Sequence, residues 1–331
     1  MIEEFGKLPN GDLVNRVRLT GGGLTANVLT YGAILQDLRL EGHGAPLVLG
    51  LLDLEAYFKH SPYFGATAGR CANRIRGGHL ELDGTTYQLN RNFLGKHCLH
   101  GGQESMGKQL WRLEECQSDK VEMSITLADG HMGFPGKLHA RLIYSLLPDG
   151  VFDIQLLATC DSLTLCNLAH HSYWTLDDSG TVREHVMQID AQSYLPVDKE
   201  LIPTGEVALV ADTQFDFRNG AMVKAASALD HNFCISNSPQ SIRKVASLKS
   251  LRSGIELVIR TTEPGLQVYS GERVDVPVAG LSGEPMGAFA GIAIEPQRWP
   301  DANHHPKFAQ ATLKVGEAYR QHTQFKISKE T

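Results

Sequence analysis

The chain has 331 residues and a formal net charge of -6 at pH 7. It is long enough to bury a large core. No basic stripe indicates nucleic acid, and the longest apolar stretch is too short to span a membrane. The first residues, MIEEFGKLPNGD, are acidic and polar, unlike a signal peptide. Six cysteines without a C-x-x-C pair are typical of a reducing compartment, so we expect a cytoplasmic protein.

Between frequent turn signals the chain alternates apolar and polar residues, which is typical of half-buried strands. The stretch 53–61, DLEAYFKHS, is the best helical segment and predicts about two turns. Further along, hairpins are predicted at Asp83-Gly84 and at Asp149-Gly150. ELVIRTTEPGLQVYSG predicts two paired strands around Pro264-Gly265. We therefore predict an all-β fold, a large antiparallel sandwich in which residues 1–331 form one domain.

The first stretch that looks unlike routine strand or turn is GATAGRCANRIRGG, at 65–78. Its glycines permit close approach of the backbone to a ligand. Asn73 and Arg74 offer hydrogen-bond donors, those of the arginine in a planar fork. The alternative for Arg74 is an ordinary surface ion pair.

The second stretch is KHCLHGG, at 96–102. His97 and His100 have the H-x-x-H spacing of some metal sites. On a strand, however, a separation of three residues directs two side chains to opposite faces. The spacing therefore favours a single histidine, aimed by the Gly101-Gly102 turn, over a metal site.

The third stretch is CNLAHHSYWTL, at 166–176. On a strand the adjacent His170 and His171 must point to opposite faces. Tyr173 shares the face of His171, and Trp174 shares that of His170. Aromatic rings beside a histidine suit either stacking on a sugar ring or packing in the core.

The fourth stretch is GIAIEPQRWPDANHHP, at 291–306. An apolar run leads to Glu295, and Pro296 holds that residue extended at the point where we expect the strand to end. This suits a positioned acid or base, and equally a strand-ending charge. Histidines, a carboxylate, an arginine and an amide would together suit acid–base chemistry on a polar, uncharged substrate such as a sugar.

Several motifs together resemble a known family, the aldose 1-epimerases (galactose mutarotases), from about residue 30 to the end. The motifs are GRCANRI, LHGG, NLAHHSYW, IPTGEV with DTQFDFR, LDHNF, TTEPGLQVYSG and EPQRWPDANHHP. The resemblance implies a galactose mutarotase-like supersandwich. It also implies an isomerase that interconverts the α and β anomers of free hexoses without a metal or an organic cofactor.

The resemblance also implies roles for individual residues. Glu295 resembles the catalytic base and His171 the acid. Tyr173 is expected to line the pocket. The groups expected to hold the sugar hydroxyls are Asn73, Arg74, His100, Asp230 and Gln267.

The sequence departs from the family pattern in three places, which bear on the preferred sugar. His170 stands where asparagine is common, and Ser105-Met106-Gly107 where Gly-Phe-Asp is common. His304 and His305 replace the more usual asparagine and glutamine.

Two alternative functions remain open at this point. One is a hexose-6-phosphate 1-epimerase, because Arg70, Arg74 and Arg76 crowd one motif and cations would grip a phosphate. The other is a carbohydrate-binding or regulatory protein that has lost catalysis. In each case the expected partner is a small-molecule aldose, with no nucleic acid or membrane, and the chain is expected to be a monomer or a homodimer.

Overall fold

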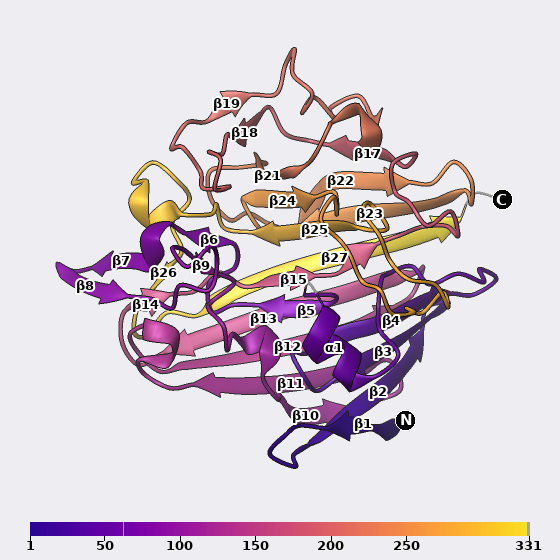
Figure 1. Ribbon diagram of the computed structural model, residues 1–331, viewed down its shortest axis with the longest axis horizontal. Coiled ribbons are helices and arrows are strands. Elements are labelled where there is room, and N and C mark those ends of the chain that lie inside the picture. The colour runs from indigo at the N-terminus through magenta and orange to yellow at the C-terminus, as the bar shows by residue number, and fades with distance from the viewer. Residues whose placement is uncertain (62, 330–331) are drawn as a thin grey trace.

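A long antiparallel sheet forms one layer of the protein, as the computed structural model shows for the residues it describes, 1–61 and 63–329 (Figure 1). Buried and accessible side chains alternate along its central strands, so one face of the sheet is covered. In spatial order this 9-stranded sheet consists of β10 (Arg112–Cys116), β11 (Lys120–Leu127), β12 (Leu138–Leu147), β13 (Val151–Cys160), β27 (Tyr319–Lys329), β23 (Ile255–Thr261), β22 (Arg243–Lys249), β17 (Val186–Ile189) and β20 (Ala221–Met222).

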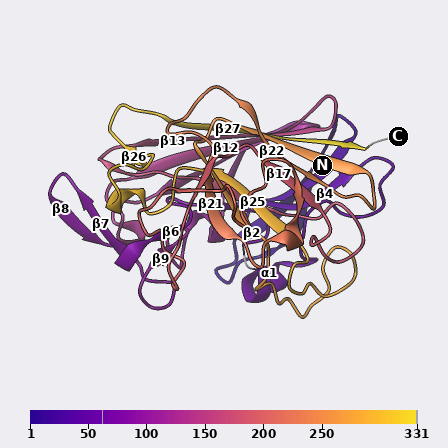
Figure 2. The same cartoon turned by 90° about the horizontal axis from the view of Figure 1, so that it is seen from above.

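A second antiparallel layer packs against the first, as the view from above shows (Figure 2). Every residue of its strand β25 is buried, so this layer is covered on both faces. The 6-stranded sheet of this layer runs in the order β16 (Tyr173–Trp174), β25 (Ile292–Gln297), β24 (Gly265–Tyr269), β21 (Asp230–Cys234), β18 (Ser193–Leu195) and β19 (Ala208–Leu209). The N-terminal 4-stranded sheet consists of β1 (Ile2–Lys7), β2 (Leu13–Gly21), β3 (Leu24–Leu29) and β4 (Ile34–Leu40).

Short strand pairs and helical turns complete the fold. The pairs are β15 (Ala169–His171) with β5 (Ala66–Ala68), β6 (Arg74–Ile75) with β9 (Cys98–Leu99), β7 (His79–Leu82) with β8 (Thr85–Gln88), and β14 (Thr164–Leu165) with β26 (Thr312–Leu313). The helices are α1 (Leu54–His60) and the 3₁₀ turns η1 (Arg76–Gly78), η2 (Met106–Lys108), η3 (His131–Gly133), η4 (Val223–Ala225) and η5 (Ala302–His304). Within the described part of the chain, no helix has the length and apolar character needed to cross a membrane.

The main hydrophobic core lies between the layers. Leu142 and Phe325 of the 9-stranded sheet, Leu266 and Ile294 of the 6-stranded sheet, and Val17 of the N-terminal sheet belong to one cluster of buried side chains. Complete burial of one such large side chain contributes roughly 1.5 to 3 kcal/mol. Because the side chains on one face of β25 are packed in this core, the strand holds the side chains on its other face in fixed positions.

Most of the predicted local structure is confirmed. The Asp83-Gly84 turn joins β7 to β8, with Leu80 opposite Tyr87. The Asp149-Gly150 turn joins β12 to β13. The predicted helix is α1, and the Asp53 carboxylate caps it by accepting from the Ala56 N–H at 2.8 Å. The predicted all-β antiparallel sandwich is confirmed as well.

The predicted pairing around Pro264-Gly265 is wrong. β23 pairs with β22 and β27 in the 9-stranded sheet, whereas β24 pairs with β21 and β25 in the other layer. The chain therefore crosses between the layers at this point instead of turning back as a hairpin. β23 pairs with the preceding strand β22 and with the distant β27, and both partners of β24 are also distant in the sequence, which no local turn signal reports.

The predicted strand end at Pro296 is also wrong. β25 continues through Pro296 to Gln297, which lies opposite Gly265 of β24. On its other edge, β25 pairs with β16 only at Ile292 and Ala293. Proline is tolerated in a strand where the edge needs no ladder hydrogen bond from its nitrogen, and this stretch of β25 has such an edge. Glu295, the residue before this proline, is thus held in an extended conformation inside the strand and not at its end.

Candidate active site

The 6-stranded sheet presents a row of polar side chains on the face away from the core. Asn232, Gln267 and Glu295 are opposite one another on β21, β24 and β25, so all three share a face. Glu295 is only 2% exposed. The neighbouring Leu266 and Ile294 point the other way, into the core cluster. The alternation of β25 thus places a carboxyl group on a rigid support.

An arginine and a second carboxylate lie beside this row. Arg74, at the start of β6, donates from Nη2 to Asp230 Oδ2 at 3.0 Å, and both side chains are largely buried. Gln267 Nε2 donates to Asp230 Oδ1 at 2.7 Å. The Arg74 guanidinium also lies over the ring of Phe93, 4.7 Å from its centroid. These contacts fix the orientation of the Arg74 fork.

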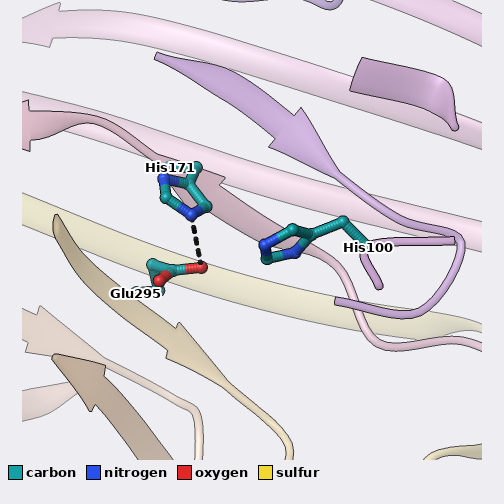
Figure 3. A group of neighbouring side chains, drawn as sticks. All are labelled: His100, His171 and Glu295. Atoms are coloured by element: carbon teal, nitrogen blue, oxygen red, sulfur yellow. Dashed lines mark ion pairs between the residues drawn. The ribbon is translucent and has the colours of Figure 1, made fainter. Parts of the chain in front are cut away.

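His171 approaches Glu295 from a different strand pair. It is the last residue of β15, which pairs with β5, and its Nε2 lies 3.5 Å from Glu295 Oε2 (Figure 3). Burial lowers the pKa of the His171 imidazole to about 4. Burial, reinforced by the nearby Asp230 carboxylate, raises the pKa of Glu295 well above its ordinary value. Both shifts favour the uncharged forms, a protonated carboxyl beside a neutral imidazole.

A tight turn carries His100 to the same place. The N–H of Asn73 donates to His100 Nδ1 at 3.1 Å, and the His100 N–H donates to the Asn73 carbonyl at 2.9 Å. Both residues have positive φ, 61° and 51°. Next in the chain, Gly101 is required, because a Cβ there would lie 2.2 Å from the Gly69 carbonyl oxygen. Because Nδ1 accepts, the neutral ring carries its proton on Nε2.

The side chains of His100, His171 and Glu295 form a cluster whose candidate ligand atoms all lie within 4.8 Å of one another. Histidines that bind a metal usually donate their other ring N–H to an acceptor. His100 does the opposite, since its Nδ1 accepts from a backbone N–H. The cluster is therefore arranged to hydrogen-bond a ligand, with His100 Nε2 as a donor. Sequence spacing did not indicate this cluster, because its members come from three separate motifs.

The predicted division between His170 and His171 is confirmed. His170 points into the core, where Nδ1 lies 2.9 Å from the Tyr144 hydroxyl and Nε2 lies 2.7 Å from Ser172 Oγ. Trp174 lies on the same side. Tyr173 follows His171 instead, with its ring centroid 5.2 Å from that of the imidazole.

The predicted division between His97 and His100 also holds. His97 Nδ1 accepts from the Gly77 N–H at 3.0 Å, and its Nε2 lies 3.1 Å from a Glu200 carboxylate oxygen. His97 thus takes no part in the cluster with His171. The alternation of side chains along a strand accounts for His170 and His171, whereas His97 and His100 diverge because His100 lies in the turn that follows β9, with a positive φ.

The three arginines of the 65–78 stretch diverge. Arg70 is 1% exposed and donates to the carbonyls of Pro135 and Gly136. Arg76 donates to the Pro203 carbonyl, away from the row. Arg74 alone of these three joins the polar row.

Two residues near the site were missed by sequence reasoning. The Tyr63 ring lies 4.6 Å from that of His100 and 5.9 Å from that of His171, between centroids. Lys108 Nζ lies 5.3 Å from the centroid of the Tyr63 ring. Tyr63 sits in irregular chain after α1, where periodicity gives no direction for a side chain, so no local signal marks it.

Some polar atoms of the site are available to hydrogen-bond a ligand. Glu295 Oε2 and Arg74 Nε are buried and have no hydrogen-bond partner within the described residues. Buried polar groups in native proteins are nearly always paired, so unpaired ones in a site indicate groups that a polar ligand satisfies. The site therefore combines a buried carboxyl–imidazole pair with polar groups that can hydrogen-bond a ligand.

A buried carboxyl–imidazole pair, formed by Glu295 of the 6-stranded sheet and His171 of β15, lies beside amide and guanidinium groups, and such a site suits an enzyme with a polar, uncharged ligand. The chain belongs to the aldose 1-epimerase family, whose sequence model, described as "Aldose 1-epimerase", matches residues 15–326.

Similar proteins cover nearly the whole chain. It is 37% identical to the galactose mutarotase of Bos taurus over an alignment that covers 98% of this chain and 97% of that one. The aldose 1-epimerase of Haemophilus influenzae is 36% identical over 83% of each chain. An aldose epimerase homologue from C. elegans has a similar structure, with a TM-score of 0.91, 31% identity and coverage of 96% of this chain and 100% of that one.

Proposed function

We propose that the protein is an aldose 1-epimerase that interconverts the α and β anomers of free hexoses such as galactose and glucose. The observation that carries this proposal is the buried pair of Glu295 and His171, 3.5 Å apart, beside the hydroxyl-binding groups of Arg74, Asp230 and Gln267. The names of the related proteins support the same reaction.

The reaction is an opening and closing of the sugar ring. A base takes the proton of the C1 hydroxyl while an acid protonates the ring oxygen, so the ring opens to the aldehyde. Rotation about C1–C2 then lets the C5 hydroxyl attack the other face of the carbonyl. Glu295 is the proposed base and His171 the proposed acid. In the reverse direction the two residues exchange these roles.

The proton inventory of the pair fits this chemistry. Burial raises the pKa of the Glu295 carboxyl and lowers that of the His171 imidazole, so in the free protein the proton of the pair is favoured on Glu295. The same single proton, carried by His171 instead of Glu295, gives the imidazolium and carboxylate that the ring opening uses, and the two facing atoms lie 3.5 Å apart. No further proton has to enter the buried site.

The remaining groups hold the sugar. We propose that the fork of Arg74 and the amide of Gln267 bind hydroxyls, with Asp230 as an acceptor. Nε2–H of His100 supplies a donor, since its Nδ1 is engaged by Asn73. The ring of Tyr173 lines the pocket beside His171. The reaction requires neither a metal nor an organic cofactor, because the pair itself moves the protons.

The two alternative functions have less support. A dianionic phosphate needs several cations, whereas Arg70 and Arg76 turn away from Arg74 and the site. A purely sugar-binding protein has no need of the Glu295 and His171 pair, which is buried at a cost in desolvation.

We further propose that residues 1–331 act as one domain, as a monomer or a homodimer in the cytoplasm, with no nucleic-acid or membrane partner. The cysteines support the compartment: Cys71, Cys98, Cys116, Cys160, Cys166 and Cys234 are all free thiols. Sedimentation of the purified protein measures the oligomeric state.

A polarimeter tests the proposed reaction directly. Freshly dissolved α-galactose or α-glucose approaches its anomeric equilibrium slowly, and catalytic amounts of the protein should accelerate that approach. Glucose 6-phosphate serves as the comparison substrate. Saturable sugar binding without acceleration would favour the binding protein, and a preference for the phosphate would favour the other epimerase.

A further inference from the structure

Two tyrosine rings lie close to the imidazole of His171. The centroid of Tyr173 is 5.2 Å from that of His171, with an angle of 32° between the planes. The centroid of Tyr63 is 5.9 Å away, with an angle of 30°. Both distances are within the roughly 6 Å over which the electron-rich face of an aromatic ring attracts a cation. Strand alternation by itself places Tyr173 beside His171, whereas Tyr63 lies in a loop that is distant in the sequence.

The backbone holds Tyr63 in this position. Its φ is 69°, a left-handed conformation that costs a non-glycine residue energy and often marks a functional site. The Phe64 N–H donates to Ser61 Oγ at 3.0 Å, and the Ala66 N–H donates to the Tyr63 carbonyl at 3.1 Å. The Gly65 N–H donates to the carbonyl of His171 itself at 3.1 Å. The turn that carries Tyr63 is thus attached to the backbone of the residue that its ring approaches.

We propose that Tyr63 is a positioning residue for the reaction: its ring, together with that of Tyr173, holds the imidazole of His171 and stabilises the protonated imidazolium. This inference rests on the proposed role of His171 as the acid. Burial disfavours a positive charge on His171, so the acid step needs a compensating attraction. The quadrupole of an aromatic ring provides one without adding a competing proton donor.

Other charged groups also act on His171, so the test must separate the ring from them. The Asp230 carboxylate favours the imidazolium, whereas Arg74 opposes it. Lys108 lies over Tyr63, so removal of the ring also frees that ammonium group. The titratable and charged groups around His171 are Arg74, His100, Lys108, His170, Asp230 and Glu295.

The experiment measures the pKa of the His171 imidazole by NMR in the intact protein, with a His171→Gln spectrum to assign the signal. Tyr63→Leu removes the ring and should lower this pKa by roughly 0.5 to 1.5 units, with a fall in kcat of roughly 3- to 30-fold. Tyr63→Phe keeps the ring and should stay within about 0.3 unit of the parent. Tyr63→Met keeps the volume and replaces the leucine variant if that one does not fold.

Two controls belong to this test. Phe58→Leu removes an aromatic ring from α1, where Phe58 is 42% exposed and packs on Tyr31, and it should leave the His171 pKa unchanged. Lys108→Met measures the contribution of the displaced ammonium group.

The sign of the shift decides between two roles of Tyr63. If the ring only covered the site, its removal would admit water and raise the pKa of His171. A rise, or no shift in a folded Tyr63→Leu protein, overturns the proposal. Because the NMR titration does not depend on turnover, it separates this inference from the proposed function: a lowered pKa in a protein without epimerase activity supports the first and sinks the second.

Discussion

Replacement of Glu295 by glutamine tests the proposed mechanism most directly. Glu295 is 2% exposed and lies opposite Gln267 in the sheet, and glutamine has nearly the same volume. A carboxyl whose pKa is raised on folding stabilises the native state less as the pH rises above its ordinary value of 4.5. At pH 8 the neutral amide should therefore leave the melting temperature unchanged or raise it.

The expected loss of activity follows from the proton transfer that the amide cannot perform. A positioned acid or base contributes roughly 10²- to 10⁴-fold to the rate, which is about 3 to 5.5 kcal/mol of barrier. KM should barely move, because the amide still hydrogen-bonds the sugar, while kcat falls at least about a hundredfold. His171→Gln should have the same effect, and the double variant should lose far less than the product of the two losses.

The assay is polarimetry of α-galactose with wild-type and Glu295→Gln protein, beside a thermal melt of each at pH 8. A glutamate that merely supports the strand predicts the reverse pattern, a lower melting temperature with nearly normal turnover. Normal kcat in the variant would refute the assignment of the base. Asp230, the other carboxylate of the site, would then be the next candidate.

Four other outcomes are expected. Arg74→Lys should lower kcat/KM roughly 10- to 100-fold because lysine lacks the planar fork. Arg76, whose side chain is 46% exposed, is the control, and Arg76→Lys should have nearly normal kinetics. Equal kinetics for the two variants would show that Arg74 does not bind the substrate. His100→Gln should raise KM roughly tenfold and His97→Gln should not, and indistinguishable KM values would contradict the assigned donor. The rate should fall on acidification only near pH 4, the lowered pKa of His171. Glu295 is already protonated there, so the Glu295 and His171 pair takes up a second proton. A fall in rate near pH 6.5 would contradict the assignment of one proton to the pair. Exhaustive chelation should leave activity unchanged, and loss of activity with recovery on adding zinc would show that the histidine cluster holds a metal.

Local pattern in the sequence determined much of this protein. Turn residues and period-two alternation predicted the sandwich class, the hairpins at Asp83-Gly84 and Asp149-Gly150, and the short helix. The same alternation placed His170 in the core and His171 in the site. These features depend only on neighbours along the chain, because side-chain direction in a strand is fixed by the backbone pleat.

The tertiary structure determined which distant segments of the chain lie side by side. β23 and β24 are neighbours in sequence, yet each finds its partners in a different sheet. His100, His171 and Glu295 come from three separate motifs, and Tyr63 joins them from irregular chain without periodicity. Such contacts require the closure of long loops, and their gain is the burial of surface shared by distant segments. The sequence therefore supplied the individual groups, and only the packing of the sheets on a common core brought the carboxyl, the imidazoles and the aromatic rings close to one another.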